Sequence, residues 1–550
     1  MSNVTKTYLL PKKILNKSGN IENEKALFDN EREQIFVSEK NYCICRGKGF
    51  LLLDFGKELC GGIRILNHDE DACCVPQRIR IRFGESVNEC FAEINEKNAD
   101  NHHSIRDLTV TLPRYFDGEF GQTGFRFVRI DFLEAAEYRL VNVYAVSYFT
   151  DEARKGRFEC DDKLINDIYE TSAYTVSLNM QRFLWDGIKR DRLIWVGDMQ
   201  PEVGAITYLY GKSDCVERTL KTVTEATPLP AWFGNIPSYS MWFIKIVYEY
   251  ALKNDDKKFA LNYLPYIEGI LRQINDCVQP DGDINYSLSS ALCPGDGYFF
   301  DWPSSGSLDC KIGNRYITVY CLNTLKALYK FLDVKENPLC DAVLKKIALK
   351  RGSEPVLKQI IAMGYFSEHL DKSFVADKLI RGGASGVSAF MSYYILSAIA
   401  ETSEPGIALN VMKEYYGGML SVGATSFWEE FDIDWLKNSD RIDKLTADGK
   451  KDIHGDFGDY CYKGFRRSLC HGWACGPIQF LTEYVLGVKI SEKGYRKIRI
   501  EPNMCHLKWV KGSVPTPYGI VTIEHSLNKN GIVLTTVQAP KEVEYEVIVR

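Results

Sequence analysis

The chain has 550 residues, of which 45% are hydrophobic and 26% are charged, and 68 Lys and Arg residues nearly balance 73 Asp and Glu residues. This length predicts three or four domains, and the composition excludes a disordered, collagen-like or coiled-coil chain. The formal net charge of -5, without a basic stripe, argues against a nucleic-acid partner.

The cysteines and the amino terminus predict a location. The 17 cysteines are odd in number and irregularly spaced, with no CxxC pair and no Cys/His zinc spacing. The first twenty residues lack the apolar run of a secretory signal, and no apolar stretch approaches the ~20 residues of a membrane helix. Because many unpaired thiols are a hazard in an oxidising compartment, we expect a cytoplasmic protein with no membrane partner. We expect its cysteines to be small buried hydrophobic side chains, with a reactive or metal-binding cysteine as the alternative.

The first region, from about residue 34 to 150, has short strand-like runs. Residues 78–83 and 125–130 alternate apolar with polar side chains, as in strands with one buried face and one solvent-exposed face. Repeated short strands with glycine-bearing turns predict an amino-terminal β-sandwich over residues 1–150.

The period changes to that of helices near residues 151–155. Asp161 is the expected N-cap of a first helix, whose apolar residues begin at Leu164. Long loops rich in Gly, Pro and Asp separate the helical patterns, and no fixed-period repeat indicates a solenoid. We therefore expect helical hairpins around an axis over residues 151–487. The further helical patterns lie at about 240–253, 258–276, 317–333, 339–350, 386–401, 407–416 and 475–486.

Strand-like runs return at about residue 488 and predict a small carboxy-terminal antiparallel β domain over residues 488–550.

Tryptophan marks the region in which to look for chemistry. All nine Trp residues lie between 185 and 509, and eight of them between 185 and 473. Trp stacks on sugar faces and other flat ligands, although core burial is its commoner role. Several of these Trp residues stand beside carboxylates, which favours a ligand site. The four segments concerned are 185–198, 300–303, 423–431 and 468–477.

The first of these segments holds three Asp, two Arg and two Trp within 14 residues. Arg190 and Arg192 flank Asp191, and adjacent cations favour the ionised carboxylate. A general acid at this position would need burial or a second carboxylate to oppose that effect. The alternative is a surface network of salt bridges.

The other three segments add a second carboxylate site. Glu429 follows Trp428 after a small-residue turn that can project it into a cleft, or it begins a helix with Glu in the first turn. His471 lies near Trp473 and can bind a ligand hydroxyl, although a lone His is more often structural. Two separated carboxylate sites beside Trp are what inverting glycoside hydrolysis requires, because one group protonates the leaving oxygen while the other activates water about 6.5–9.5 Å away.

These motifs resemble those of the bacterial α-L-rhamnosidases, glycoside hydrolase family 78. Residues 186–198 resemble the family signature, and GFLLLDFGKELCGG, IRFGES, NHHSIRD and GFRFVRI resemble its amino-terminal β-sandwich. GATSFWE and SLCHGWACGP resemble its catalytic barrel, and GSVPTPYG its carboxy-terminal β domain. The resemblance covers nearly the whole chain. It implies a central (α/α)6 barrel between the two β domains, inversion at the anomeric carbon, no cofactor and no metal.

Carried over position by position, the resemblance makes Glu429 the general base that activates water. Many members read Arg-Asp-Glu-Arg with the Glu as proton donor, whereas this chain reads Arg190, Asp191, Arg192, one residue shorter. Asp191 is the only carboxylate left there and is therefore implied as the donor. The implied substrate-pocket residues are Asp186 and Asp198, which would hold rhamnose hydroxyls, with Arg190, Arg192, Trp195, Asp301, Trp302, Trp428 and His471.

We therefore expect an inverting exo-glycosidase that removes terminal α-L-rhamnose from small glycosides or oligosaccharides, and a homodimer is compatible with this function. One alternative is a related glycosidase for another deoxy-sugar, an arabinoside or a uronide. The other is a sugar-binding protein that has lost catalysis. The chain has no HExxH, GxxxxGK[ST] or GxGxxG motif in a fitting context. Segment 429–459, with ten carboxylates, is expected to be a solvated loop or a lid.

Overall fold

The protein divides into two compact units, each built from segments far apart in the sequence. A computed structural model describes residues 4–29, 41–68, 76–286, 297–350, 353–460 and 462–548. Unit 1 consists of Met1–Asp151, Ser177–Leu193 and Met419–His471, and unit 2 of Glu152–Val176, Ile194–Gly418 and Gly472–Arg550. The loops that carry Asp191 and Glu429 therefore belong to the same unit as the amino-terminal strands.

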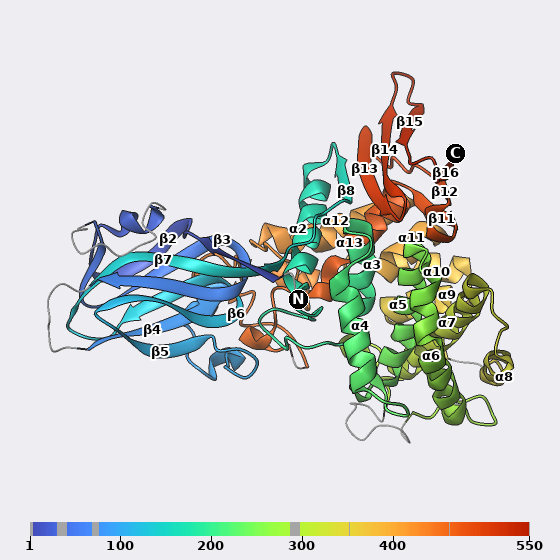
Figure 1. Ribbon diagram of the computed structural model, residues 1–550, viewed down its shortest axis with the longest axis horizontal. Coiled ribbons are helices and arrows are strands. Elements are labelled where there is room, and N and C mark those ends of the chain that lie inside the picture. Colours follow the sequence, from blue (N-terminus) through green and yellow to red (C-terminus); the bar gives the residue numbers. More distant parts are fainter. Residues whose placement is uncertain are drawn as a thin grey trace. The chain divides into compact units, whose positions relative to one another are not determined.

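Unit 1 contains a seven-stranded sheet in the order β1-β7-β3-β6-β4-β5, with β2 paired to β3 (Figure 1). All of these pairs are antiparallel except that of β3 and β7. The predicted alternation is confirmed in β4, where Ile79 and Ile81 are fully buried and Arg78 is exposed, but it is wrong for residues 125–130 of β6, which are buried on both faces of the strand. The strands are β1 (Val4–Leu9), β2 (Lys13–Glu22), β3 (Cys43–His68), β4 (Gln77–Gly84), β5 (Asp107–Leu112), β6 (Tyr115–Phe132) and β7 (Glu137–Thr150).

The helices lie mainly in unit 2, and the predicted helical ranges fall on eight of them. Helix α2 begins at Lys163, and its N-cap is Asp162 rather than the expected Asp161. The Asp162 carboxylate accepts hydrogen bonds from the backbone N–H groups of Leu164 (2.9 Å) and Ile165 (3.3 Å). The predicted helices are α2 (Lys163–Asn179), α5 (Pro237–Asn254), α6 (Lys257–Cys277), α7 (Leu308–Leu332), α8 (Pro338–Ile347), α11 (Ser392–Thr402), α12 (Pro405–Ser421) and α13 (Gly476–Phe480).

Among the described residues, five further helices were not predicted: α1 (Val87–Phe91), α3 (Met199–Leu209), α4 (Asp214–Ala226), α9 (Lys358–Phe366) and α10 (Lys372–Ile380). Every residue of α3 is buried, as is most of α9. A helix that is enclosed on all sides has no polar face, so its sequence lacks the 3.6-residue period by which helices are recognised.

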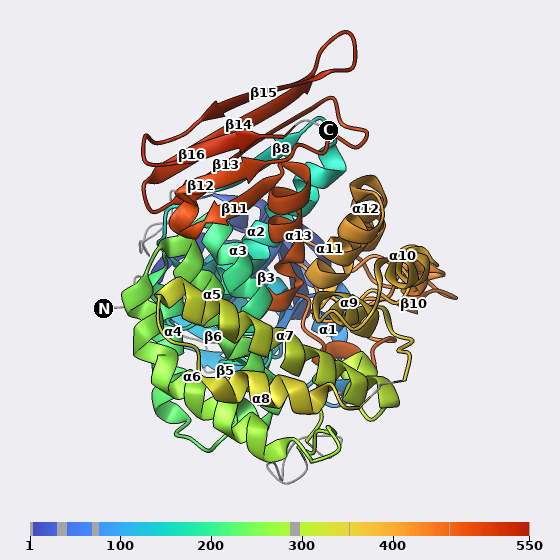
Figure 2. The same cartoon turned by 90° about the vertical axis from the view of Figure 1, so that its right-hand side faces the viewer.

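Six helices of unit 2 pack in a closed ring, and their labels can be followed in Figure 2. In the ring α3 contacts α5, α5 contacts α7, α7 contacts α9, α9 contacts α11, α11 contacts α13, and α13 returns to α3. Helix α6 packs against α5 and α7, and α10 packs against α9 and α11. The ring is thus formed by alternate helices along much of the chain, as expected for successive hairpins.

The carboxy-terminal strands form a β domain, as the sequence predicts, but one of its strand pairs is parallel, so the expectation of a wholly antiparallel domain is wrong. One sheet has the order β11 (Val488–Glu492), β12 (Lys497–Ile500), β16 (Glu544–Val547). The other has the order β15 (Val533–Gln538), β14 (Gly519–Leu527), β13 (Trp509–Thr516), β8 (Arg157–Cys160). Strand β8 directly precedes α2 in the chain, so the start of the helical region contributes an edge strand to this domain.

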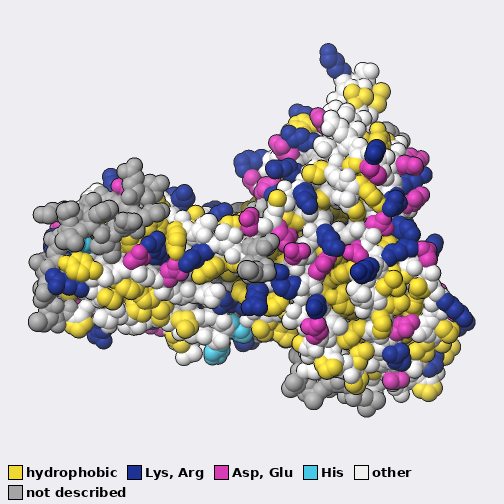
Figure 3. Space-filling view, viewed as in Figure 1, with side chains coloured by type: hydrophobic (Ala, Val, Ile, Leu, Met, Phe, Trp, Pro, Cys, Tyr) yellow, Lys and Arg dark blue, Asp and Glu magenta, His cyan; other side chains and the backbone are white. Residues whose placement is uncertain are grey.

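Thirteen cysteines lie among the described residues, and all are free thiols. Twelve are buried and Cys505 is exposed, in keeping with small hydrophobic side chains. Burial raises the pKa of the Cys45 thiol to about 11, which makes it unreactive. Among the described residues, the helices are too short or too polar to cross a membrane. On the face drawn in Figure 3, acidic and basic side chains are interspersed, as the balanced composition predicts.

Candidate active site

The loop that carries Asp191 is closed by the side chain of Asp186. The Asp186 carboxylate accepts hydrogen bonds from the backbone N–H of Leu193 (2.9 Å) and of Asp191 (3.2 Å). Gly187 is required where the loop turns, because a Cβ atom there would lie 2.3 Å from the carbonyl oxygen of Arg190. Arg192 has a φ of 61°, a left-handed conformation that costs a non-glycine residue on the order of 1 kcal/mol. The backbone at Asp191 is thus held in one tight turn.

The loop that carries Glu429 is paired with the segment that ends at His471. The backbone N–H of Glu429 donates to the carbonyl of Ser468 (3.1 Å), and the N–H of Ser468 donates to Glu429 Oε2 (2.9 Å). The backbone N–H of His471 donates to the carbonyl of Phe427 (2.9 Å). His471 in turn forms a β-bridge with Gly187, which joins this pair to the Asp191 loop.

Arg190 contacts both predicted catalytic carboxylates. Its Nε lies 3.2 Å from Asp191 Oδ1 and its Nη1 lies 3.5 Å from Glu429 Oε1. Because both nitrogens belong to one planar guanidinium group, these two oxygens lie within roughly 9 Å of each other. His471 Nδ1 is 3.9 Å from the same Glu429 oxygen. Glu429 is buried and Asp191 is half-buried.

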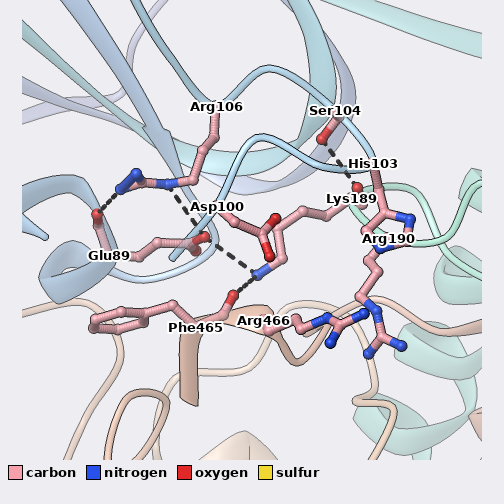
Figure 4. Close-up of a pocket in the computed structure, with 9 residues that line it drawn as sticks. All are labelled: Glu89, Asp100, His103, Ser104, Arg106, Lys189, Arg190, Phe465 and Arg466. Carbon is pink, nitrogen blue, oxygen red and sulfur yellow. Dashed lines mark hydrogen bonds and ion pairs between the residues drawn. The ribbon is translucent and has the colours of Figure 1, made fainter. Parts of the chain in front are cut away.

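Lys189, a buried residue of the Asp191 loop, donates hydrogen bonds to the segment just before Ser468 (Figure 4). Lys189 Nζ lies 2.8 Å from Glu85 Oε2 and 3.3 Å from Glu89 Oε1, and it donates to the carbonyl of Arg467 (2.9 Å). Glu85 also accepts from the backbone N–H of Leu469 (2.6 Å). Burial alone would lower the pKa of Lys189, but Glu85 and Glu89 raise it above its ordinary value, so the ammonium stays charged.

The same cluster offers three metal-type ligands. The ligand atoms of Glu85, Glu89 and His454 lie within 4.8 Å of one another. The Lys189 ammonium already forms ion pairs with the carboxylates of Glu85 and Glu89. His454 Nδ1 is hydrogen-bonded to Ser86 Oγ at 2.8 Å. We interpret the cluster as an internal ion pair that fixes the backbone of both loops.

Lys189→Met is expected to destabilise the protein by about 3–5 kcal/mol, because Glu85 and Glu89 would be left buried without their cation. The measurement is the free energy of unfolding from urea denaturation. Lys97→Met is the matched control, because Lys97 is 39% exposed and pairs with Asp456 at 2.6 Å. Such an exposed pair contributes about 0–1 kcal/mol. Equal losses in the two variants would contradict the bracing role of Lys189.

The other predicted residues of unit 1 lie around these loops. Arg192 donates from Nη1 to the carbonyl of Gln122 (2.9 Å), and its guanidinium stacks 4.9 Å from the ring of Trp185. Trp428 is fully buried, with its ring perpendicular to that of Phe431. Its indole therefore packs inside the protein next to Glu429.

Four predicted residues lie in unit 2, where a row of aromatic rings connects them. Trp195 contacts Tyr239, Tyr239 contacts Phe299, and Phe299 contacts Trp302 at ring distances of 6.1, 5.8 and 5.1 Å. The Tyr239 hydroxyl donates to Asp198 Oδ1 at 2.9 Å. Asp301 caps a short helical turn by accepting from the N–H of Ser304 (3.1 Å), and burial raises its pKa to about 6. The structure thus brings segments 195–198 and 301–302 together.

Sequence reasoning missed His103 and Tyr239 as residues of these two groups. His103 Nδ1 lies 3.2 Å from Asp191 Oδ1. The segment NHHSIRD was noticed as a motif, but no pattern linked it to a residue 88 positions later. Tyr239 stands in an ordinary apolar helix and gave no signal.

Two family models match the chain. Residues 153–252 match the bacterial alpha-L-rhamnosidase 6 hairpin glycosidase domain, and residues 487–550 match the bacterial alpha-L-rhamnosidase C-terminal domain. No curated protein matches the chain significantly.

Solved structures of rhamnosidases have the same fold. A GH78 family rhamnosidase of Bacillus sp. GL1 is 21% identical with a TM-score of 0.75, and the match covers 93% of this chain and 55% of that one. Streptomyces avermitilis alpha-L-rhamnosidase complexed with L-rhamnose is 15% identical with a TM-score of 0.70, covering 90% and 48%. A Klebsiella oxytoca rhamnosidase with rhamnose bound is 16% identical with a TM-score of 0.66, covering 88% and 96%.

The chain thus spans about half the length of the Bacillus and Streptomyces proteins and nearly all of the Klebsiella protein. The predicted resemblance is confirmed by the two domain matches and by the shared fold. The chain thus carries two domains of the bacterial α-L-rhamnosidase type, in a fold that it shares with rhamnosidases of solved structure.

Proposed function

We propose that this protein is an inverting exo-glycosidase that hydrolyses terminal α-L-rhamnosides, with Asp191 as general acid and Glu429 as general base. The observation that carries the proposal is the contact of one guanidinium, that of Arg190, with both carboxylates. It keeps the two groups within roughly 9 Å, inside the upper limit of about 9.5 Å for an inverting pair with a water molecule between them.

The surroundings of Glu429 suit a base. Its Oε2 accepts from the N–H of Ser468, while Arg190 and His471 lie near Oε1. The Arg190 guanidinium gives the carboxylate a counter-charge, and the carboxylate is the form that removes a proton from water. In the proposed step Glu429 takes this proton, the resulting hydroxide bonds to the anomeric carbon, and Asp191 protonates the departing oxygen.

The remaining predicted residues are proposed to bind the sugar. Asp198 and Asp301 are buried carboxylates beside the half-buried rings of Trp195 and Trp302, a combination that suits hydroxyl groups and an apolar sugar face. Asp186 is proposed to act mainly through the loop that it closes around Asp191. Arg190, Arg192 and His471 complete the proposed set, and Trp428, whose ring is fully buried, is proposed to act only by supporting Glu429 beside it.

The domain organisation is also part of the proposal. The closed ring of α3, α5, α7, α9, α11 and α13 supports an (α/α)6 barrel over residues 151–487. The seven-stranded sheet supports an amino-terminal β-sandwich over residues 1–150, and residues 488–550 form the second β domain. The twelve buried free cysteines support a reducing, cytoplasmic location, in which the substrates would be small imported glycosides.

Aryl glycosides of different sugars test the substrate. We expect efficient hydrolysis of the aryl α-L-rhamnoside and much slower hydrolysis of the matching fucoside, arabinoside and glucuronide, because the Streptomyces and Klebsiella proteins of the same fold have rhamnose bound. Faster turnover of one of the other sugars would assign the same site to that sugar. Saturable rhamnose binding in calorimetry, without hydrolysis of any glycoside, would instead indicate a sugar-binding protein.

A further inference from the structure

A loop of the amino-terminal strand region meets the loop of Asp191 at two points. His103 lies in this loop, just before β5, and its Nδ1 is 3.2 Å from Asp191 Oδ1. The next residue, Ser104, donates from Oγ to the carbonyl of Lys189 at 3.0 Å and pairs with Thr123 Oγ1 at 2.6 Å. The hydrogen bond from the adjacent Ser104 to Lys189 therefore holds His103 against the loop of Asp191.

The two histidines of this loop differ in their surroundings. The side chain of His102 is 75% exposed, and it lies 3.4 Å from Asp100 at the surface. The side chain of His103 is 24% exposed and lines a small pocket together with Arg190 and Arg466 (Figure 4). The sequence thus supplies a matched pair of histidines, each beside an aspartate, of which one faces the proposed acid.

The charges around His103 favour a neutral imidazole. Burial lowers the pKa of His103, the nearby Arg190 and Arg466 lower it further, and Asp191 and Asp100 oppose this effect without reversing it. A neutral imidazole can donate one hydrogen bond without placing a second full positive charge beside the acid. This matters because an added cation would favour the ionised form of Asp191, which has no proton to give.

We propose that His103 is a positioning residue for the general acid, and that its Nδ1–H donates to Asp191 Oδ1 so that the other carboxyl oxygen carries the catalytic proton. The inference rests on the role proposed above for Asp191. During the step the proton passes from Asp191 to the glycosidic oxygen, which keeps the electron pair of the breaking bond to the anomeric carbon. His103 neither gains nor loses a proton.

The test compares His103→Ala, His103→Gln and His102→Ala in the full chain, on two α-L-rhamnosides. One has a good leaving group, 2,4-dinitrophenol, and the other a poor one, methanol. A group that serves the acid matters most when the leaving oxygen needs a proton. We expect His103→Ala to lower kcat by about 10- to 100-fold on the methyl rhamnoside and by less than about 3-fold on the dinitrophenyl rhamnoside.

The other two variants separate positioning from structure. Gln keeps a neutral N–H donor, so His103→Gln is expected to recover most of the activity on the methyl rhamnoside. His102→Ala is expected to match the parent protein on both substrates. Equal losses on the two substrates in His103→Ala, no loss at all, or the same loss in His102→Ala would overturn the proposal. If His103→Ala does not fold by circular dichroism, the substrate dependence of His103→Gln, compared with His103→Leu, decides in its place.

The activities of the parent protein and of Asp191→Asn separate the role of His103 from the proposed function. If the parent protein hydrolyses neither rhamnoside, both proposals fall. If the parent is active and Asp191→Asn shows the leaving-group dependence while His103→Ala does not, only the role of His103 is rejected.

Discussion

Glu429→Gln is expected to lower kcat on an aryl α-L-rhamnoside by about 10²- to 10⁴-fold, the range that general base catalysis supplies. Gln has the shape of Glu, and its amide oxygen can still accept from the N–H of Ser468, so the loop is expected to keep its conformation. The amide has no basic oxygen with which to take a proton from water. The measurement is steady-state hydrolysis, with circular dichroism to check folding.

Glu430→Gln is the matched control for this variant. Glu430 is the next residue, half-buried, and accepts from the N–H of Asp459 at 3.3 Å, and its pKa is raised to about 7 by burial. The pKa of its carboxyl group is thus shifted by burial, but the ion pair with Arg190 belongs to Glu429. Nearly normal turnover in Glu429→Gln would reject its role as the base. An equal loss of kcat in Glu430→Gln would show that either substitution acts by disturbing the loop, and not by removing the base.

Asp191→Asn is expected to reduce kcat by about 10²- to 10⁴-fold on rhamnosides with poor leaving groups and by far less on those with good ones. The reason is that a departing nitrophenolate is stable without a proton, whereas an alkoxide is not. The measurement is kcat for a series of aryl and alkyl rhamnosides plotted against the acidity of the leaving group. The plot should be steeper for Asp191→Asn than for the parent protein.

Asp443→Asn serves as the control for Asp191→Asn. Asp443 also lies in unit 1 and pairs with an arginine, Arg441, at 2.7 Å. Its replacement is expected to leave the slope of the plot unchanged. An unchanged slope in Asp191→Asn, whatever the loss of activity, would mean that another group supplies the proton.

Much of the fold could be predicted because its elements carry a periodic pattern. The alternation in β4 and the long apolar face of α7 are visible in the sequence, and both elements are found where expected. Helix α3 could not be predicted, because all of its residues are buried and no polar face interrupts them. The composition changes near residue 151, but the compact units do not follow this change, since 177–193 and 419–471 cluster with the amino-terminal strands.

The candidate site was predictable by residue type and resemblance but not by its connections. Asp191 and Glu429 stood out beside Trp and Arg, yet nothing in their spacing shows that Arg190 contacts both. Lys189 looked like one more charge in the signature, and only its burial against Glu85 and Glu89 reveals that it braces the two loops. The contacts of Arg190 with Glu429, and of Lys189 with Glu85 and Glu89, arise from tertiary packing between segments more than 70 residues apart, which no local pattern records.

Asp191 and Glu429 are proposed to act on opposite sides of the anomeric carbon, and the configuration of the first product tests this directly. Hydrolysis of an aryl α-L-rhamnoside is followed by ¹H NMR in D₂O from the first minutes, before the free sugar equilibrates. Inversion predicts that β-L-rhamnose appears first and the α anomer only later by mutarotation. Initial formation of α-L-rhamnose would contradict the account.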